Sequence, residues 1–326
     1  MESLRNFIHQ KKNDKNFCTV SKTISIIIIL YCLWPGRFAT RFEYISSDNI
    51  FDKLVPETTR NISLQKLGEC NNEEIIKENK HIDKKEIDCT KINNQNILPG
   101  GEFYPKDCRA RFSTAIIVPY RQRQWQLNKF LVYMHNFLEQ QQIHYRIFVV
   151  EQHDDKPFNR AKLLNIGAEI ALSYEFPCLI FHDVDILPSN LGQLYACASS
   201  PRHMCSNLDI FRYNLPYRGL FGGVVSIRSV QFQQVNGMSN LFSGWGGEDD
   251  DFYERITSRD LKIVRFDPAY SEYIMMVHKK EKPSEDRLKY LYSGPLRYYS
   301  DGLNSLKYKR LKTKTQHLYT HVLVDT

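Results

Sequence analysis

Four consecutive acidic side chains, from Glu248 to Asp251, follow a tryptophan between glycines in the stretch "GWGGEDDD" (244–251). Acids in the first turn of a helix are favoured by the helix dipole, and Phe252 and Ile256 share a helical face, so the stretch predicts a helix start. Carboxylates also accept hydrogen bonds from sugar hydroxyls or act as a general base, and the ring of Trp245 could stack on a sugar. The run is therefore a candidate site for chemistry on a sugar.

A second group of acids lies in "HDVDILP" (182–188), where Asp183 and Asp185 follow an apolar run. Residues two apart in an extended chain point to the same face, so these carboxylates could share a divalent ion and the sugar phosphate that it carries. Met275 and His278 stand in an M-x-x-H spacing. A carboxylate, an imidazole and a thioether suit a borderline ion such as Mn²⁺ better than Mg²⁺. The alternatives are a solvated turn for the aspartates and core packing for the Met–His pair.

Two arginines, Arg121 and Arg123, follow another apolar run in "VPYRQR" (118–123). A guanidinium group is a planar, bidentate donor, which suits a phosphate or the edge of a nucleobase. The arginines and the aspartates together indicate a binding site for a phosphorylated ligand.

Alternating strands and helices must position these side chains. Apolar runs at 114–120, 146–150 and 178–181 predict strands, and apolar residues at helical spacing predict helices over 127–138 and 159–174. This alternation predicts an α/β fold with a mostly parallel sheet, in which ligands bind at the carboxyl ends of the strands. The arginines and aspartates come directly after such ends.

The N-terminal region predicts a membrane protein. Residues 23–34 are almost wholly apolar, and a signal anchor over 17–38 reaches spanning length if Lys22 extends its amine to the interface. Basic residues over 1–16 predict a cytoplasmic tail and a lumenal remainder, which is a single-pass type II topology. A cleaved signal peptide is the alternative because the apolar stretch is short. A lumenal location permits disulfides and makes Asn61, in "NIS", a candidate glycan acceptor.

The rest of the chain divides by composition. Residues 39–98 are polar with few clustered apolar side chains, which predicts a stem that does not order by itself, followed by a lumenal catalytic domain over 99–326. The excess of 44 Lys and Arg over 37 Asp and Glu gives a net charge of +7, but the bases are scattered. No nucleic-acid partner is expected from this distribution.

The order of the motifs resembles that of the β-1,4-galactosyltransferase family, glycosyltransferase family 7. The matching blocks lie within about 99–326 and are "VPYRQR", "FNRAKLLNIG", "FHDVDILP", "FGGV", "NGMSN", "GWGGEDDD", the M-x-x-H pair and "SDGLNSL". The resemblance implies a Rossmann-like, glycosyltransferase A-type fold in a single catalytic domain with a mixed, mostly parallel sheet. It also implies a Golgi membrane enzyme that inverts the donor's anomeric centre, uses a UDP-sugar and depends on Mn²⁺.

Roles for individual residues follow from the same resemblance. It implies Asp249 as the catalytic base, Glu248 as a contact to the donor hydroxyls, and Asp250 and Gly247 as contacts to substrate. The ligands of Mn²⁺ would be Asp185, Met275 and His278. The nucleotide and donor would be held by Pro119, Arg121, Arg123, Phe158, Arg160, Asp183, Val184 and Trp245.

Leu220 is the most informative departure from the family pattern. Galactose-using members carry Tyr before "FGGV", where it crowds carbon 2 of the donor, whereas this chain carries Leu220. The shorter side chain leaves room for an N-acetyl group, as in the invertebrate N-acetylgalactosaminyltransferases that the chain resembles most. The prediction is transfer of GalNAc from UDP-GalNAc to the 4-hydroxyl of a terminal β-linked GlcNAc on a glycoprotein or glycolipid. The alternatives are a neutral exchange in a packed wall, and galactose transfer from UDP-Gal to GlcNAc or xylose.

Two further classes of protein compete with a transferase. A lectin-like domain could use Trp245 and the acids to bind glycans without turnover, but it has no need of the metal and phosphate residues. A metal-dependent hydrolase is another class, although its usual ligand spacings are absent from the sequence.

The cysteines agree with a lumenal domain. The resemblance implies a disulfide between Cys178 and Cys197 and a second one at Cys108, whose partner is Cys70 by spacing or else Cys89. Cys205 has no expected partner.

Overall fold

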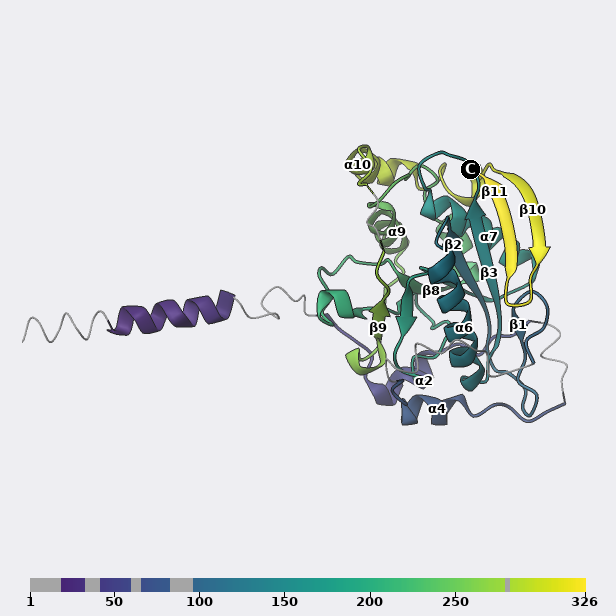
Figure 1. Cartoon of the computed structure of the whole chain (residues 1–326), viewed down its shortest axis with the longest axis horizontal. Coiled ribbons are helices and arrows are strands. Elements are labelled where there is room, and N and C mark those ends of the chain that lie inside the picture. Colours follow the sequence, from purple (N-terminus) through teal and green to yellow (C-terminus); the bar gives the residue numbers. More distant parts are fainter. Residues whose placement is uncertain (1–18, 33–41, 60–65, 83–95, 279–281) are drawn as a thin grey trace, which may run out of the picture. The chain divides into compact units, whose positions relative to one another are not determined.

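The computed structural model describes residues 19–32, 42–59, 66–82, 96–278 and 282–326, shown in Figure 1. The chain divides into two compact units, Met1–Arg41 and Phe42–Thr326. In the first unit, residues 19–32 are helical. None of the helices in the described residues combines the length and hydrophobicity needed to cross a membrane. The ends of the predicted 17–38 anchor, Asn61 and Cys89 lie outside the described residues.

The second unit is built on an eight-stranded mixed sheet whose main path runs β10-β11-β3-β2-β4-β8-β6, with β1 paired to β3. The pairs β11–β3, β3–β2 and β2–β4 are parallel, and the remaining pairs are antiparallel. The predicted α/β fold with a mixed sheet is therefore confirmed. The strands are β1 (Glu102–Phe103), β2 (Ser113–Tyr120), β3 (His144–Gln152), β4 (Cys178–His182), β6 (Arg202–His203), β8 (Val224–Arg228), β10 (Lys309–Thr315) and β11 (Thr320–Asp325).

A smaller sheet has the order β5-β9-β7. Its strands are β5 (Ile186–Pro188), β7 (Asn207–Leu208) and β9 (Glu272–Met275). In the antiparallel pair β5–β9, Ile186 lies opposite Met275. This pairing brings the M-x-x-H motif beside the second aspartate of the D-V-D motif.

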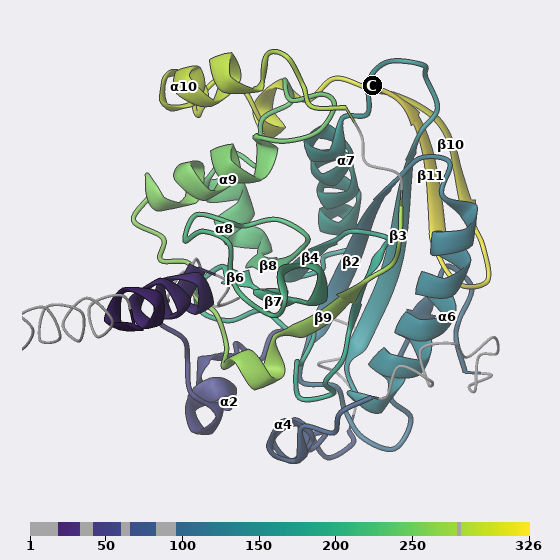
Figure 2. The ribbon, with the colours of Figure 1, turned by 60° about the vertical axis from the view of Figure 1, so that its left-hand side comes forward.

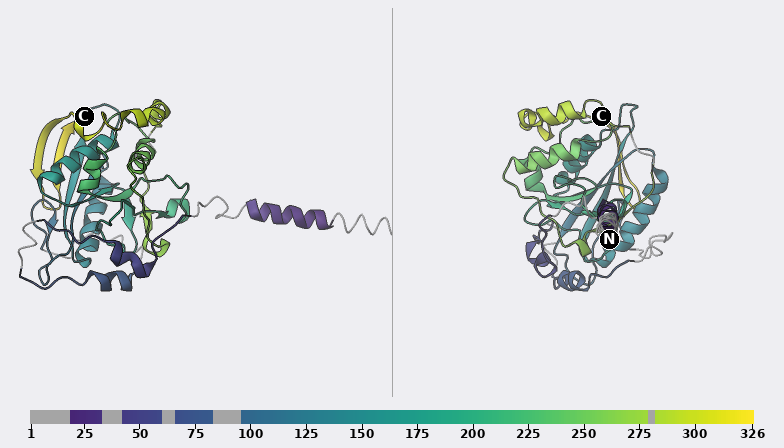
Figure 3. Two further views of the ribbon diagram at one scale, coloured as in Figure 1. Left: turned by 180° about the vertical axis from the view of Figure 1, so that it is seen from behind. Right: turned by 90° about the vertical axis from the view of Figure 1, so that its left-hand side faces the viewer.

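Helices cover both faces of the large sheet, as Figure 2 shows, and β10 and β11 form one of its edges, drawn in yellow in Figure 3. The α-helices of this unit are α2 (Ile50–Lys53), α4 (Asn72–Glu78), α6 (Gln124–Gln140), α7 (Arg160–Ser173), α8 (Ser229–Gln234), α9 (Glu248–Thr257) and α10 (Arg287–Arg297). Short 3-10 helices occur at η2 (Ser47–Asn49), η3 (Asp209–Phe211), η4 (Pro268–Tyr270) and η5 (Leu303–Ser305).

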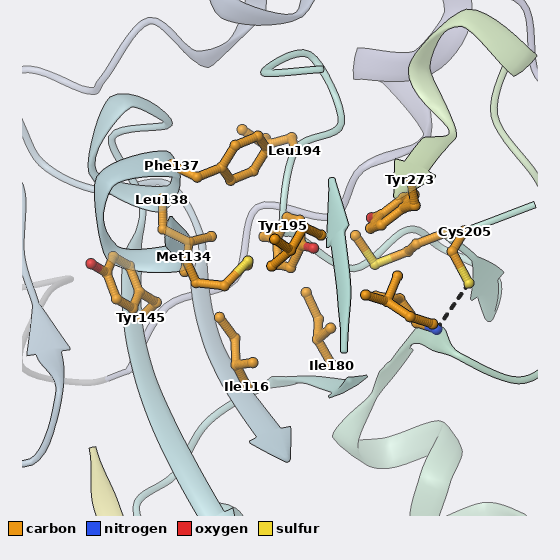
Figure 4. Close-up of a cluster of buried hydrophobic side chains, with 14 of the residues drawn as sticks. Ile116, Met134, Phe137, Leu138, Tyr145, Ile180, Leu194, Tyr195, Cys205 and Tyr273 are labelled. Carbon is orange, nitrogen blue, oxygen red and sulfur yellow. Dashed lines mark hydrogen bonds between the residues drawn. The ribbon is translucent and has the colours of Figure 1, made fainter. Parts of the chain in front are cut away.

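Two hydrophobic cores lie on opposite faces of the sheet. Alternate residues of β2 enter them, because successive side chains of a strand point to opposite faces: Ile116 belongs to the α6 side and Ile117 to the side of α7, α8 and α9. Figure 4 shows part of the first core, where Met134 and Leu138 of α6 face the sheet near Ile116. The carboxyl ends of the central strands are thus held between two packed layers.

The described parts of the expected stem, residues 42–59 and 66–82, belong to the same compact unit as the rest of the domain, so the boundary predicted near residue 98 does not hold for them. The compact unit begins at Phe42. Its early residues enter the core on the α6 side, including Ile50, Leu54, Ile76 and Ile82. Composition missed this because the apolar side chains are few and scattered, and each packs against the domain instead of against its sequence neighbours.

Two disulfides join segments of this unit. Cys70 pairs with Cys108 and Cys178 pairs with Cys197, which confirms both expected bridges. The first bridge ties the N-terminal segment to the chain that leads into β2. Cys205 is a buried free thiol.

Candidate active site

The ends of β2 and β4 bring the arginines to the D-V-D motif. Arg123 Nη1 lies 2.6 Å from Asp185 Oδ2, and Arg160 Nε, at the start of α7, lies 2.7 Å from Asp183 Oδ1. Each carboxylate is therefore paired with one guanidinium. Val184, between the aspartates, is buried, and Pro119 is buried near the end of β2.

His278 contacts Asp185, the second carboxylate of the D-V-D motif. Its Nδ1 lies 2.9 Å from Asp185 Oδ2, and the amide of Met276 donates to the Asp185 carbonyl at 2.7 Å. Burial raises the pKa of Asp185, and the neighbouring charge of Asp183 raises it further, whereas His278 and Arg123 act in the opposite direction. A cation bound here would stabilise the charged form of this carboxylate.

The donor set decides which ions fit this place. Among the residues that the structure describes, no group of three or more His, Cys, Asp and Glu side chains could hold a metal. In the β5–β9 pair Met275 lies opposite Ile186, the residue next to Asp185, so Met275 is a candidate third protein donor beside Asp185 and His278. Carboxylate, imidazole and thioether together fit a borderline divalent ion such as Mn²⁺.

The acidic run begins α9, as its sequence predicts. Its N-cap is Gly247, whose φ of 94° lies in the left-handed region, and a Cβ there would come within 2.9 Å of the ring of Phe242. Glycine is therefore required at this position. The helix N-terminus offsets part of the repulsion among the four carboxylates.

The four acids point to different partners. Glu248 Oε1 lies 3.8 Å from Arg160 Nη1, so this arginine links the D-V-D motif to α9. Asp250 Oδ1 accepts a hydrogen bond of 2.8 Å from the Tyr217 hydroxyl. Asp251 is buried and pairs with Arg255, with Oδ2 and Nη2 3.3 Å apart. Glu248 thus contacts the arginine that pairs with Asp183, whereas Asp251 pairs with a buried arginine of its own helix.

Asp249 has a strongly perturbed carboxylate. Burial raises its pKa to about 7, and the charges of Glu248 and Asp250 contribute to the rise, against the effect of Arg160. A Cβ on Gly222 would meet its Oδ2 at 2.8 Å, so the chain after Leu220 packs closely against this carboxylate. A side chain with a pKa near 7 can accept a proton efficiently near neutral pH.

A cleft of about 530 Å³ opens beside Arg121, Arg123 and His278. Arg121 stacks over the ring of Phe158 at 5.3 Å and donates to the Lys156 carbonyl at 2.7 Å. The cleft is lined by Arg121, Gln122, Arg123, Gln126, His153, Asp154, Asp155 and His278. Arg121, Arg123 and His278 thus meet at a single opening, and Arg123 and His278 both contact Asp185.

The comparisons with known proteins agree with this geometry. The family model for the N-terminal region of glycosyl transferase group 7 matches residues 69–198, and the model for the N-terminal domain of galactosyltransferase matches 202–279. Human β-1,4-galactosyltransferase 4 is 41% identical over 229 residues, which cover 69% of this chain and 67% of the relative. Human β-1,4-galactosyltransferase 1 is 41% identical over 236 residues, or 71% of this chain and 59% of the relative.

A solved structure supports the same assignment. A mutant of Drosophila β-1,4-galactosyltransferase 7, in complex with manganese, UDP-Gal and xylobiose, is 31% identical to this chain, with a TM-score of 0.58. The match covers 66% of this chain and 94% of that one. The chain belongs to the β-1,4-galactosyltransferase family. It spans 64% of the length of β-1,4-galactosyltransferase 2 of Cricetulus griseus and 59% of human β-1,4-galactosyltransferase 1.

Two residues that the family pattern places at the donor lie on loops. Trp245 is 59% exposed, and its backbone pairs with the segment before α10 through Lys282 and Ser284. The role of its ring over a donor therefore stays a prediction. Leu220 is half-buried, and its amide donates to the Tyr217 carbonyl at 3.2 Å. It lies two residues before the glycine that packs on Asp249.

Sequence reasoning missed several residues of the candidate site. Gln126, His153, Asp154 and Asp155 line the cleft but belong to no recognisable motif. Tyr217 was missed too, although it precedes Leu220 by only three positions. The anchoring role of Asp251 had a signal, because Asp251 and Arg255 stand at i, i+4 in a predicted helix.

Proposed function

We propose that this protein is an inverting β-1,4-glycosyltransferase that moves GalNAc from UDP-GalNAc to the 4-hydroxyl of a terminal β-linked GlcNAc in a Mn²⁺-dependent reaction. The main support is the contact of 2.9 Å between Asp185 and His278 at the end of β4, beside a cleft with two arginines. This arrangement joins a place for a cation to a place for a diphosphate.

The metal would be held by Asp185, His278 and Met275. The Drosophila relative was solved in complex with manganese and UDP-Gal. When bound, Mn²⁺ would offset the negative charge of the UDP leaving group. Arg121 and Arg123 line the same cleft and would bind the diphosphate, because guanidinium groups pair well with phosphate oxygens.

Asp249 would act as the base. Its pKa of about 7 lets the carboxylate accept the proton of the acceptor 4-hydroxyl as that oxygen attacks the anomeric carbon. Attack from the face opposite to the leaving UDP inverts the anomeric centre. Glu248, held near Arg160, would orient donor hydroxyls, and Asp250 with Tyr217 would orient the acceptor sugar.

The choice of donor rests on Leu220. A leucine leaves more space than a tyrosine beside carbon 2 of the donor, which favours an N-acetylated sugar. UDP-Gal is the second candidate, because the named relatives are galactosyltransferases and one was solved with UDP-Gal and xylobiose. A pocket of this type typically discriminates by ~1–3 kcal/mol, so residual galactose transfer is expected.

The place of action would be the Golgi membrane, with the domain in the lumen and a single-pass type II topology. The apolar stretch 23–34 follows basic residues in the sequence. The two disulfides support an oxidising compartment for the domain. GlcNAc-terminated glycans of glycoproteins or glycolipids would be the partners.

One assay separates these functions. The purified protein is incubated with Mn²⁺, a β-GlcNAc glycoside and either UDP-GalNAc or UDP-Gal, and both UDP and the disaccharide are quantified. We expect equal amounts of UDP and disaccharide, with a higher kcat/KM for UDP-GalNAc. A preference for UDP-Gal would overturn the donor assignment. Binding of the glycoside without release of UDP would support the lectin-like alternative.

A further inference from the structure

The loop that carries Leu220 connects η3 to β8 and is held from behind by one buried arginine. Nη2 of Arg265 donates to the carbonyl of Arg218 at 2.9 Å and to the carbonyl of Leu220 at 2.9 Å. These two carbonyls flank Gly219, a residue type with wide backbone freedom. The guanidinium therefore restrains the backbone on both sides of the most flexible position next to Leu220.

Arg265 is itself fixed by its surroundings. The residue is 5% exposed, and Nε lies 3.3 Å from Nδ1 of His203. The ring of Phe42 lies over the guanidinium at 5.2 Å, and the amide of Ile45 donates to the Arg265 carbonyl at 2.8 Å. The first residues of the folded unit thus form one wall around this arginine.

We infer that Arg265 is a positioning residue that sets the donor preference by fixing the backbone at Leu220, and that Phe42 supports it. This inference rests on the proposed function. A planar guanidinium can bond two carbonyls and stack on a ring at the same time, whereas an ammonium group is a point charge without a flat face. Phe42, in the segment expected to be a stem, thereby becomes part of the support for the donor pocket.

The physical basis is that the backbone around Leu220, which forms a wall of the proposed donor pocket, has little room to move. Leu220 lies two residues before Gly222, whose Cβ position is 2.8 Å from Asp249 Oδ2, so the chain has little room on that side. Arg265 restrains the other side. If the restraint is lost, the Leu220 side chain samples several positions, and the space beside carbon 2 of the donor is no longer defined.

The test compares Arg265→Lys with wild type and with the control Arg259→Lys. Arg259 likewise stacks on an aromatic ring, that of Tyr299 at 4.4 Å, but it contacts neither carbonyl of the loop. We expect Arg265→Lys to lower the ratio of kcat/KM for UDP-GalNAc over UDP-Gal by about tenfold, within the range known for pockets of this size. Arg259→Lys should keep the wild-type ratio. An unchanged ratio in Arg265→Lys would overturn the inference.

A second variant keeps the test valid if Arg265→Lys does not fold. Phe42→Leu removes the ring over the guanidinium and leaves both carbonyl contacts in place, so we expect a smaller change of the ratio in the same direction. A wild-type ratio in Phe42→Leu would show that Phe42 does not support Arg265 in setting the donor preference.

Limited trypsin digestion measures the mobility of the loop and does not depend on enzymatic activity. Arg218 is exposed within the loop, and release of the loop should speed cleavage after it in Arg265→Lys and not in Arg259→Lys. If wild type transfers neither sugar but Arg265→Lys is still cleaved faster than Arg259→Lys, the proposed function is wrong and the restraint of the loop by Arg265 is confirmed. Equal cleavage rates in both variants would show that Arg265 does not restrain the loop.

Discussion

Asp249 combines a position beside the loop of Leu220 with a pKa raised to about 7, chiefly by burial. Its neighbours Glu248 and Asp250 are engaged by Arg160 and Tyr217. The four acids that appear equivalent in the sequence therefore have different tasks, and Asp249 is the one whose proton affinity suits a base near neutral pH.

The first prediction concerns this carboxylate. Asp249→Asn keeps the shape but removes the base, so kcat should fall by roughly 10²–10⁴-fold. In wild type the base must be deprotonated, so kcat/KM should rise with pH through the raised pKa of about 7. The control is Asp155→Asn, an exposed acid that lines the cleft. Retention of wild-type kcat in Asp249→Asn would show that another group takes the proton.

The second prediction concerns the donor. In Leu220→Tyr the larger side chain should crowd the N-acetyl group, and the ratio of kcat/KM should shift towards UDP-Gal by about 10–100-fold. Steady-state kinetics with both donors measures this ratio, and Leu241→Tyr serves as a control at an exposed leucine of another loop. A ratio equal to that of wild type would mean that Leu220 is a neutral part of the wall.

At the scale of elements, α9 is anchored through its fourth acid. Arg255, fully buried, pairs with Asp251 and donates to the carbonyls of Gly237 at 3.3 Å and Asp301 at 2.7 Å. These carbonyls belong to the "NGMSN" and "SDGLNSL" motifs, which also join directly where Asn240 donates to the Gly302 carbonyl at 2.7 Å. Both motifs therefore support the helix that carries the acids.

The third prediction follows from this anchor. Asp251→Ala removes the nearer of the two carboxylates that pair with the buried guanidinium of Arg255 and leaves only Asp301, at 4.0 Å, which should lower the free energy of unfolding by about 3 kcal/mol. Urea denaturation followed by circular dichroism measures the change. Glu254→Ala, on the exposed side of the same helix, should change the stability by less than about 0.5 kcal/mol. A loss of similar size in both variants would argue against a specific role for the pair.

The elements also show what a sequence can and cannot predict here. Asp183, Asp185 and the start of α9 were predictable, because they depend on local signals, the end of an apolar run and acids after glycine. The meeting of Asp185 with His278 depends on the pairing of β5 with β9, which joins segments some 90 residues apart and has no local signal. The family resemblance supplied that link, and side-chain spacing alone did not.

At the scale of the whole molecule, the folded unit reaches back to Phe42. Ile50, Leu54, Ile76 and Ile82 enter the core, and Cys70 is bonded to Cys108. The composition of residues 39–98 is polar on average, so it did not reveal these contacts. A few side chains buried against the surface of the domain suffice to order a segment.

The fourth prediction tests this extension of the domain. Ile76→Ala should lower the free energy of unfolding by about 2–5 kcal/mol, because Ile76 is 2% exposed and its loss leaves a cavity. Leu67→Ala, at a leucine that is 45% exposed, is the matched control and should have little effect. Equal midpoints of urea denaturation for Ile76→Ala and wild type would show that the segment around Ile76 does not stabilise the domain.

The central claim is that Asp185 and His278 hold one divalent cation beside the nucleotide cleft. Calorimetric titration of Mn²⁺ into the protein in the presence of UDP tests it directly. We predict a single site whose affinity falls tenfold or more in His278→Ala. In His153→Ala, which alters an exposed histidine of the same cleft, the affinity should stay as in wild type. Wild-type Mn²⁺ affinity in His278→Ala would contradict the account.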